Sequence, residues 1–303
     1  MVQSVRLVSQ RHVNPLATLY GGYMLQWVVD TGAIAAMGFA EGNVVLGFLD
    51  RMHFVTPVRA GDLLTFRSWV VGVRRSSLCV LVESYLGGGR QLATVGRMVF
   101  VKIDGGGRPA AVGREVRCDA GWEGLCRYFQ KWREEVDAVV EREAAPPQWR
   151  AVSHFVAMPE DSLDGVLMYG GRLLFRLDEL AFIEAFRQHP STYVTAGVNA
   201  IAFRRPIYVG DVVAVKTGVT YVGNTSVEVG FTVEAQGARG RRHVADGYFT
   251  FVNTGGKMPE ELRRLAPGDE AAARRKADSL REARELRRLK PQEGPWLLQL
   301  VGG

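Results

Sequence analysis

One segment of this chain occurs twice, and this duplication constrains the fold more than any other feature. The Tyr-Gly-Gly at residues 20–22 recurs 149 positions later, at residues 169–171. The same offset relates a second motif of the two halves, Phe54, Pro57, Gly61 and Asp62 against Phe203, Pro206, Gly210 and Asp211. An internal repeat of this length predicts two copies of one domain, and 303 residues are enough for both.

Two aligned positions differ between the copies in a complementary way. Asn14 of the first copy stands opposite Leu163, and Val29 stands opposite Asp178. Each copy therefore has a polar group where the other has an aliphatic one. This pattern is expected if the two copies build one chemical site from two unlike halves.

Each copy begins with a short segment and continues, after Tyr-Gly-Gly, into an apolar stretch with the spacing of a helix. Extended segments bounded by turn residues follow, at 44–54, 63–73, 78–85 and 91–103 and again at 193–203, 212–222, 227–235 and 244–253. The offset grows to 151 at Phe100 and Phe251, so two residues are inserted in a late loop. One helix and a largely antiparallel sheet that wraps around it make an α+β fold in each half.

The repeat and the segments around it divide the chain into four parts. We expect a first domain at 1–103, a Gly-rich exit and helical linker at 104–151, a second domain at 152–254 and a charged helical tail at 255–303. Charged residues predict helices over residues 121–143 and 269–289. In the second of these, arginines alternate with acidic residues, which favours a solvated helix over a nucleic-acid-binding stripe. The net charge of +6 favours anionic ligands only weakly.

The cysteines and the apolar runs bound the class of protein. Cys79, Cys118 and Cys126 are too few and too scattered for a disulfide framework or a zinc site, so we expect three reduced thiols and no metal. The N-terminus has no apolar core of signal-peptide length, and no run reaches the roughly 18 apolar residues of a membrane span. The sequence thus predicts a cytoplasmic protein without a membrane span.

The glycine pair that opens each predicted helix is suited to catalysis. Backbone N–H groups at a helix N-terminus are unpaired and lie at the positive end of the helix dipole, so they can bind a carbonyl oxygen that gains negative charge. Glycine has no side chain to block the approach of a ligand. Tight packing of the helix against the sheet explains the glycines equally well in either copy taken alone.

Asp178 favours the catalytic explanation of the glycines over the packing explanation, because it lies in an otherwise apolar helix. Burial of a carboxylate that has no partner and no function costs free energy. Gly170 begins the same helix about 12 Å away, which is too far for Asp178 to reach. Asp178 can instead face Gly21 or Gly22 if the two domains pack with their helices antiparallel. Asn14 lies just upstream of these glycines, so all four residues are predicted to form one composite site.

The equivalent place in the other half combines Gly170 with Leu163 and Val29 and has neither a base nor a side-chain donor. We therefore expect one active site per chain, at the interface between the domains. The acidic residues one position further along each helix, Asp30 and Glu179, point about 100° away and are interpreted as structural.

Taken together, these motifs resemble those of the hotdog-fold acyl-CoA thioesterases. The motifs are Asn14 six residues before Tyr20-Gly21-Gly22, the helix with Asp178, the segment from Phe54 to Asp62, and Ser76-Ser77. The resemblance covers residues 5–103 and 152–254, and the tandem arrangement is similar to the cytosolic long-chain acyl-CoA hydrolases. It implies two tandem hotdog domains, each a long central helix wrapped by an antiparallel sheet, packed as an intrachain pseudo-dimer.

The resemblance also implies an activity and roles for the site residues. The substrate is an acyl-CoA, hydrolysed to free fatty acid and CoA without a metal or cofactor. Asn14 orients the thioester or the attacking water, the backbone N–H of Gly21 polarises the thioester carbonyl, and Asp178 acts as nucleophile or as base for water. The chain departs from the family pattern at Tyr20, where the family often has a histidine.

Coenzyme A carries phosphates, so a basic or hydroxyl-rich turn should flank the site. Arg75 and Ser76 stand at such a turn in the first copy, and Thr225 stands at the matching turn of the second. With Gly22 they are the predicted substrate-binding residues, and a charged turn without a ligand is the alternative. The resemblance further implies homo-oligomers of double-hotdog chains, such as trimers with the charged helices outside.

Two other functions fit the same fold. A non-catalytic acyl-CoA-binding sensor needs neither Asn14 nor Asp178, so their retention in complementary copies counts against it. A hotdog dehydratase is expected to supply an active-site histidine, yet none of the five histidines recurs in both copies and only His12 lies near a motif. An acyl-CoA thioesterase is therefore the leading hypothesis.

Overall fold

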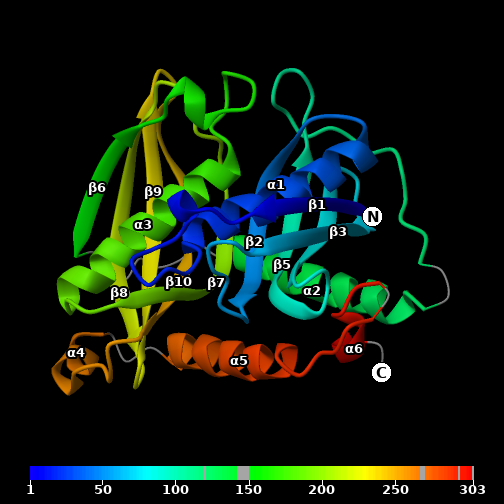
Figure 1. The fold of residues 1–303 in the computed structure, drawn as a ribbon. Helices are drawn as coiled ribbons and strands as arrows, with labels where there is room; N and C mark the ends of the chain where they lie inside the picture. Colours follow the sequence, from blue (N-terminus) through cyan, green and yellow to red (C-terminus); the bar gives the residue numbers. More distant parts are fainter. Residues whose placement is uncertain (119–120, 142–149, 267–269, 293, 302–303) are drawn as a thin grey trace. The chain divides into compact units, whose positions relative to one another are not determined.

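The computed structural model describes residues 1–118, 121–141, 150–266, 270–292 and 294–301 (Figure 1). The chain divides into two compact units. The first contains Met1–Leu19, Trp27–Arg142 and Leu280–Gly303, and the second contains Tyr20–Gln26 and Glu143–Ser279. Residues 20–26, which open the first long helix, thus group with the second unit.

The first unit contains an antiparallel sheet in the spatial order β1-β3-β4-β5-β2. Its elements are β1 (Val2–Leu7), the short 3-10 helix η1 (Gln10–His12), most of α1 (Gly21–Ala40), β2 (Val44–Phe54), β3 (Leu63–Val73), β4 (Ser77–Leu86) and β5 (Gln91–Lys102). β4 and β5 lie inside the sheet and are buried along nearly their whole length, including the charged residues Glu83 and Arg97.

The second unit repeats this arrangement, with strands in the order β7-β10-β9-β8-β6. Its elements are β6 (Ala151–Val156), η2 (Pro159–Asp161), α3 (Gly170–Gln188), β7 (Tyr193–Phe203), β8 (Val212–Val222), β9 (Ser226–Gly237) and β10 (Gly240–Asn253). Figure 1 shows α3, in green, lying across the yellow strands of this unit. The predicted α+β fold, one long helix on an antiparallel sheet in each half, is confirmed.

The duplication extends to irregularities of the backbone. Arg51 in β2 and Ala200 in β7 are related by the offset of 149, and both have a positive φ, 46° and 51°. Each lies at a β-bulge of its strand, and bulges increase the local twist that lets a sheet curve around a helix. The two inserted residues lie in the hairpin of β9 and β10, whose strands have 12 and 14 residues against 10 and 12 in β4 and β5.

Within the described residues, four helices lie outside the repeats. They are α2 (Glu123–Glu141) after the first copy, and α4 (Glu260–Leu265), α5 (Glu270–Leu286) and α6 (Leu298–Val301) after the second. α2 and α5 correspond to the two predicted charged helices, whose expected limits at Glu143 and Asp269 lie outside the described residues. Throughout the ranges that the structure describes, no helix is both long enough and apolar enough to cross a membrane.

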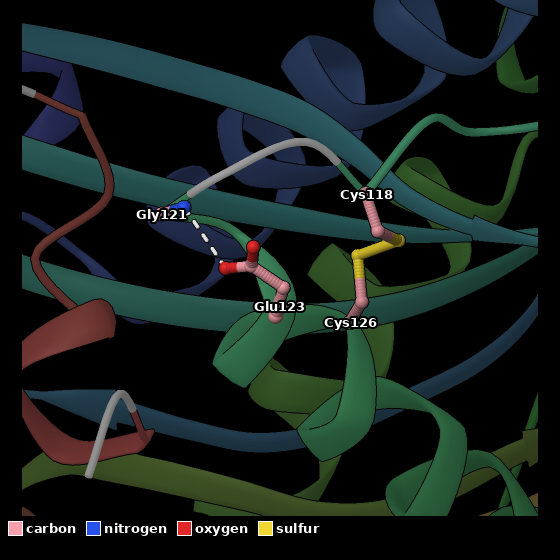
Figure 2. The surroundings of a disulfide bond; sticks show 4 residues. All are labelled: Cys118, Gly121, Glu123 and Cys126. Atoms are coloured by element: carbon pink, nitrogen blue, oxygen red, sulfur yellow. Dashed lines mark hydrogen bonds between the residues drawn. A yellow bond between two sulfur atoms is a disulfide. The ribbon is translucent and has the colours of Figure 1, made fainter.

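The expectation of three reduced thiols was wrong. Cys118 and Cys126 form a disulfide, with their Cα atoms 6.3 Å apart (Figure 2). The bond joins the segment before α2 to the first turn of that helix, where Glu123 accepts a hydrogen bond from the backbone N–H of Gly121 at 2.9 Å. Cys79 is a free, buried thiol, and burial raises its pKa to about 11.

Candidate active site

Asp178 is fully buried in the second unit, on the face of α3 that also buries Leu174, Leu177 and Ala181. Its Oδ1 accepts a hydrogen bond from the hydroxyl of Thr195 at 2.9 Å. Thr195 lies in β7, on the sheet that α3 covers. The strand next to the helix therefore holds one carboxylate oxygen and fixes the orientation of the side chain.

The first turn of α1 belongs to the same unit and lies directly against this carboxylate. A Cβ atom built on Gly21 would lie 2.9 Å from Oδ2 of Asp178 and 2.4 Å from Oγ1 of Thr195, closer than real Cβ atoms approach. Only glycine fits at this position without displacing its neighbours. The helix N-terminus, with its unpaired N–H groups, is thereby brought next to the acid.

Burial raises the pKa of Asp178 to about 7. The hydrogen bonds from Thr195, the Tyr20 hydroxyl and the Gly22 N–H act in the opposite direction, because they favour the charged form. Oδ2 makes no hydrogen bond of good geometry with any described residue, although Tyr20 and Gly22 lie close enough to affect its charge. A carboxylate held in this way is only half ionised near neutral pH, and its Oδ2 is buried without a hydrogen bond of good geometry.

The Tyr20 hydroxyl acts in this site as a hydrogen-bond donor and does not ionise. Burial, followed by the negative charges of Asp178 and Glu179, raises its pKa, so the hydroxyl stays protonated. The ring packs edge-to-face on Phe175, with 5.6 Å between centroids, and a Cβ on Gly22 would lie 2.9 Å from each of these rings. Gly22 is therefore required by aromatic packing, whereas Gly21 is required by the close approach of Thr195 and Asp178.

The second copy shows the same packing requirement without the acid. A Cβ on Gly171 would lie 2.7 Å from the ring of Tyr169, just as a Cβ on Gly22 would lie 2.9 Å from the ring of Tyr20. The second glycine of each Tyr-Gly-Gly thus has a structural explanation. Val29, the counterpart of Asp178, is fully buried in α1 and offers no polar atom.

Asn14 lies in the first unit, where its side chain closes a turn. Its Oδ1 accepts hydrogen bonds from the backbone N–H of Leu16 at 2.9 Å and from the N–H and hydroxyl of Thr18. These bonds use only the carbonyl oxygen and not the amide nitrogen. The structure describes Asn14 within this turn, and its proximity to Asp178 stays a prediction.

His12 is the histidine nearest to the motif, and its contacts are those of a structural residue. Its Nδ1 accepts a hydrogen bond from the backbone N–H of Ser9 at 3.1 Å, and burial, followed by the charge of Arg11, lowers its pKa. The equivalent residue of the second copy, Asp161, accepts from the N–H of Met158 in the same way. Both side chains cap the short helix before the Tyr-Gly-Gly segment.

The three predicted substrate-binding residues beyond Gly22 lie in equivalent turns of the two sheets. Arg75 and Ser76 lie between β3 and β4, and Thr225 lies between β8 and β9. Their carbonyl oxygens accept backbone hydrogen bonds from Val112, Lys102 and Asn253, respectively. The backbone of both turns is therefore anchored, while the side chain of Arg75 is exposed.

Thr195 is the site residue that sequence reasoning missed. A threonine in a predicted strand carries no signal of its own, because such residues are common in sheets. Its position opposite a buried acid becomes visible only when α3 lies on β7. Across the described residues, no group of three or more His, Cys, Asp or Glu side chains could hold a metal ion.

The model of one protein family matches both copies. The family is described as the thioesterase superfamily, and the matches span residues 16–93 and 166–240, which together make up half of the chain. The chain belongs to the thioesterase superfamily. Each match includes a Tyr-Gly-Gly segment, and the second includes Asp178 and Thr195.

Named relatives of this superfamily member extend the comparison. The human cytosolic acyl coenzyme A thioester hydrolase is 24% identical over 278 residues, which cover 82% of this chain and 73% of that protein. An uncharacterized acyl-CoA thioester hydrolase of Bacillus subtilis, YkhA, is 31% identical over 120 residues, 37% of this chain and 70% of its own length. The former aligns with most of the tandem chain, and the latter with a shorter stretch.

A solved structure shares the fold of this thioesterase superfamily member. An acyl-ACP thioesterase from Bacteroides thetaiotaomicron superimposes with a TM-score of 0.55 over 82% of this chain and 97% of that one. The sequence identity is 14%, so the likeness concerns the fold. It agrees with one long helix on an antiparallel sheet in each unit.

Proposed function

We propose that this protein hydrolyses acyl-CoA thioesters to a free fatty acid and CoA. The observation that carries the proposal is the buried carboxylate of Asp178, with one free oxygen, directly against the N-terminus of α1 at Gly21. Membership of the thioesterase superfamily supports thioester hydrolysis. Relatives named acyl-CoA thioester hydrolases support CoA as the carrier of the acyl group.

In the proposed mechanism, the thioester carbonyl oxygen lies at the α1 N-terminus and accepts a hydrogen bond from the Gly21 N–H. The helix dipole stabilises the negative charge that develops on this oxygen during attack. Asp178 takes a proton from water as a new carbon–oxygen bond forms, or attacks the carbonyl itself. The carbon–sulfur bond then breaks, and the thiolate of CoA leaves and takes up a proton. Where Asp178 is the nucleophile, water then hydrolyses the acyl–aspartate anhydride, which releases the fatty acid and restores the carboxylate.

Thr195 and Asn14 are given supporting roles. Thr195 fixes Oδ1 of Asp178 and so directs the free Oδ2 toward the reacting atoms. Asn14 has an amide nitrogen that its turn does not use, and we assign to it the orientation of the thioester or of the water. This role requires the two copies to pack as an intrachain pseudo-dimer, with one site per chain, since Val29 and Leu163 cannot replace Asp178 and Asn14.

The CoA contacts, the domain limits and the assembly remain part of the proposal. Gly22, Arg75, Ser76 and Thr225 are assigned to substrate binding, and the domains to residues 1–103 and 152–254, with a linker between and a tail after them. We also propose a homo-oligomer of double-hotdog chains, with a trimer as the specific form. A cytoplasmic location is proposed because the human relative is named cytosolic.

The activity is tested by the release of free thiol from palmitoyl-CoA, followed with a thiol-reactive dye. We expect turnover by the wild type and a loss of at least about a hundredfold in kcat for Asp178→Asn, which keeps the shape of the side chain but removes the base. Glu160→Gln, an exposed carboxylate of the same unit, is the matched control and should retain full activity. Binding of palmitoyl-CoA without thiol release would overturn the proposal and favour the acyl-CoA sensor.

A further inference from the structure

The first unit contains a hollow of about 580 Å³ that the proposed chemistry does not use. It lies between the C-terminal half of α1, β1, β3 and the segment that leads into α2. Its walls are mostly apolar, and they include Ala35, Phe39, Trp69 and Trp122. A volume of this size falls in the range of small-molecule sites, about 300–1,000 Å³.

The duplication shows that the residues lining this hollow differ between the two copies. By the offset of 149, Ala35 and Phe39 correspond to Glu184 and Gln188. The strand register agrees, because Val2 pairs with Ser68 in the first copy as Ala151 pairs with Thr217 in the second. The equivalent place of the second copy is therefore occupied by polar side chains.

Glu184 is fully buried in the second unit and accepts a hydrogen bond from Gln188 at 2.9 Å. The first copy has a methyl group at the position of this carboxylate and a benzene ring at the position of the amide. The two copies of the fold therefore have different side chains at the same two positions. The second copy places a polar pair there, whereas the first places apolar side chains beside the hollow.

The polar atoms around the hollow point to an anionic ligand. Ser68 lines it and is fully buried, and its Oγ has no hydrogen-bond partner among the described residues. Arg117 is exposed at the lining and forms no ion pair with any residue in the described ranges. No acidic residue is among the residues that line this hollow.

A second hollow adjoins the first and shares Phe39, Val116 and Arg117 with it. It adds three arginines and a single acid, Glu115. Two of these arginines are paired, Arg74 with Asp137 and Arg114 with Glu41, whereas Arg75 has no ion pair within the described part of the chain. The rim of the apolar hollow is therefore positively charged.

We propose that this hollow binds a fatty carboxylate, with the aliphatic chain among Ala35, Phe39, Trp69 and Trp122 and the carboxylate beside Arg117. The apolar walls favour burial of methylene groups, and a carboxylate that stays at the rim beside a cation is not desolvated without compensation. In the sequence, Trp122 lies between the two cysteines of the Cys118–Cys126 disulfide, which ties this part of the wall to α2. The aliphatic chain can come from a free fatty acid or from the acyl group of an acyl-CoA.

The test is calorimetric binding of dodecanoate and of dodecanol to the full chain carrying Asp178→Asn. This readout involves no hydrolysis, so it is independent of whether the chain is a thioesterase. We expect saturable binding of dodecanoate that falls by at least about tenfold in Ala35→Leu, which fills the hollow. Phe39→Gln, which introduces the residue of the second copy, should weaken binding in the same direction and serves if the first variant does not fold.

The charge is tested separately at the rim. Arg117→Gln should weaken dodecanoate binding about two- to fivefold and leave dodecanol unaffected, because an exposed ion pair contributes modestly. Arg90→Gln, an exposed arginine of the same unit outside both hollows, should change neither. Competition by S-dodecyl-CoA would identify acyl-CoA as a source of the chain, and lack of competition would identify the free acid. Absence of saturable binding, or binding that Ala35→Leu and Phe39→Gln leave unchanged, would overturn the proposal.

Discussion

The ionisation of one residue, Asp178, should set the pH dependence of hydrolysis. Burial raises the pKa of this carboxyl to about 7, and the proposed mechanism requires the ionised form. We therefore expect kcat/KM to rise with pH and to reach half of its maximum near pH 7, because protonation below this value removes the base. Initial rates between pH 5 and pH 9 with a short-chain acyl-CoA measure this. A rate that is already constant from pH 5 would contradict the assignment.

A second residue, Thr195, tests whether the ionisation of Asp178 sets the pH dependence. Its hydroxyl donates to Oδ1 of Asp178 at 2.9 Å and so lowers the pKa of the acid. In Thr195→Val this stabilisation of the charged form is lost, and we expect the midpoint of the pH profile to move up by about one unit. Thr192→Val, an exposed threonine of the same unit, is the control. A lower rate with an unmoved midpoint would mean that Thr195 only supports the fold.

The contact between the first turn of α1 and Asp178 depends on a glycine. A Cβ at Gly21 would lie 2.4 Å from Thr195 and 2.9 Å from Asp178, so Gly21→Ala must push the helix end away from the acid. We expect kcat to fall by about a hundredfold while the cooperative unfolding transition is retained. Gly105→Ala, where a Cβ meets nothing within 4 Å, is the matched control. Equal activity of the two variants would remove the helix N-terminus from the mechanism.

The disulfide fixes the start of α2, and its contribution can be separated from the active site. Non-reducing denaturation should expose one thiol per chain, Cys79, and reduction should expose all three. The double variant Cys118→Ser, Cys126→Ser lacks the disulfide that closes this short loop. Its free energy of unfolding should be lower than that of the wild type by about 2.5 kcal/mol. Urea titration of the two forms measures this difference. Three reactive thiols without reductant would show that the bond is absent.

The elements differ in how far the sequence could predict them. Strands such as β3 and β8 were predicted at their observed limits, because they begin directly after the turn residues Gly61-Asp62 and Gly210-Asp211. The edge strands β1 and β6 were not identified, since six half-exposed residues carry little periodic signal. Thr195 and the Cys118–Cys126 pair were missed because they depend on proximity in space. The apposition of Gly21 and Asp178 was predicted from an acidic residue among apolar neighbours in the helix, although α3 also carries the acidic residues Glu179 and Glu184.

For the whole molecule, duplication with loss of one polar partner in each copy predicts a single working site per chain. Val29, the counterpart of Asp178, is fully buried in α1, and Leu163, the counterpart of Asn14, is 71% exposed. Calorimetric titration with S-ethyl-CoA, whose short chain gains little from the apolar hollow, should give one binding event per chain. Val29→Asp should add no activity in an Asp178→Asn background, because the partner amide is still absent from that half. Two binding events, or turnover restored by Val29→Asp, would show instead that both copies retain a usable site.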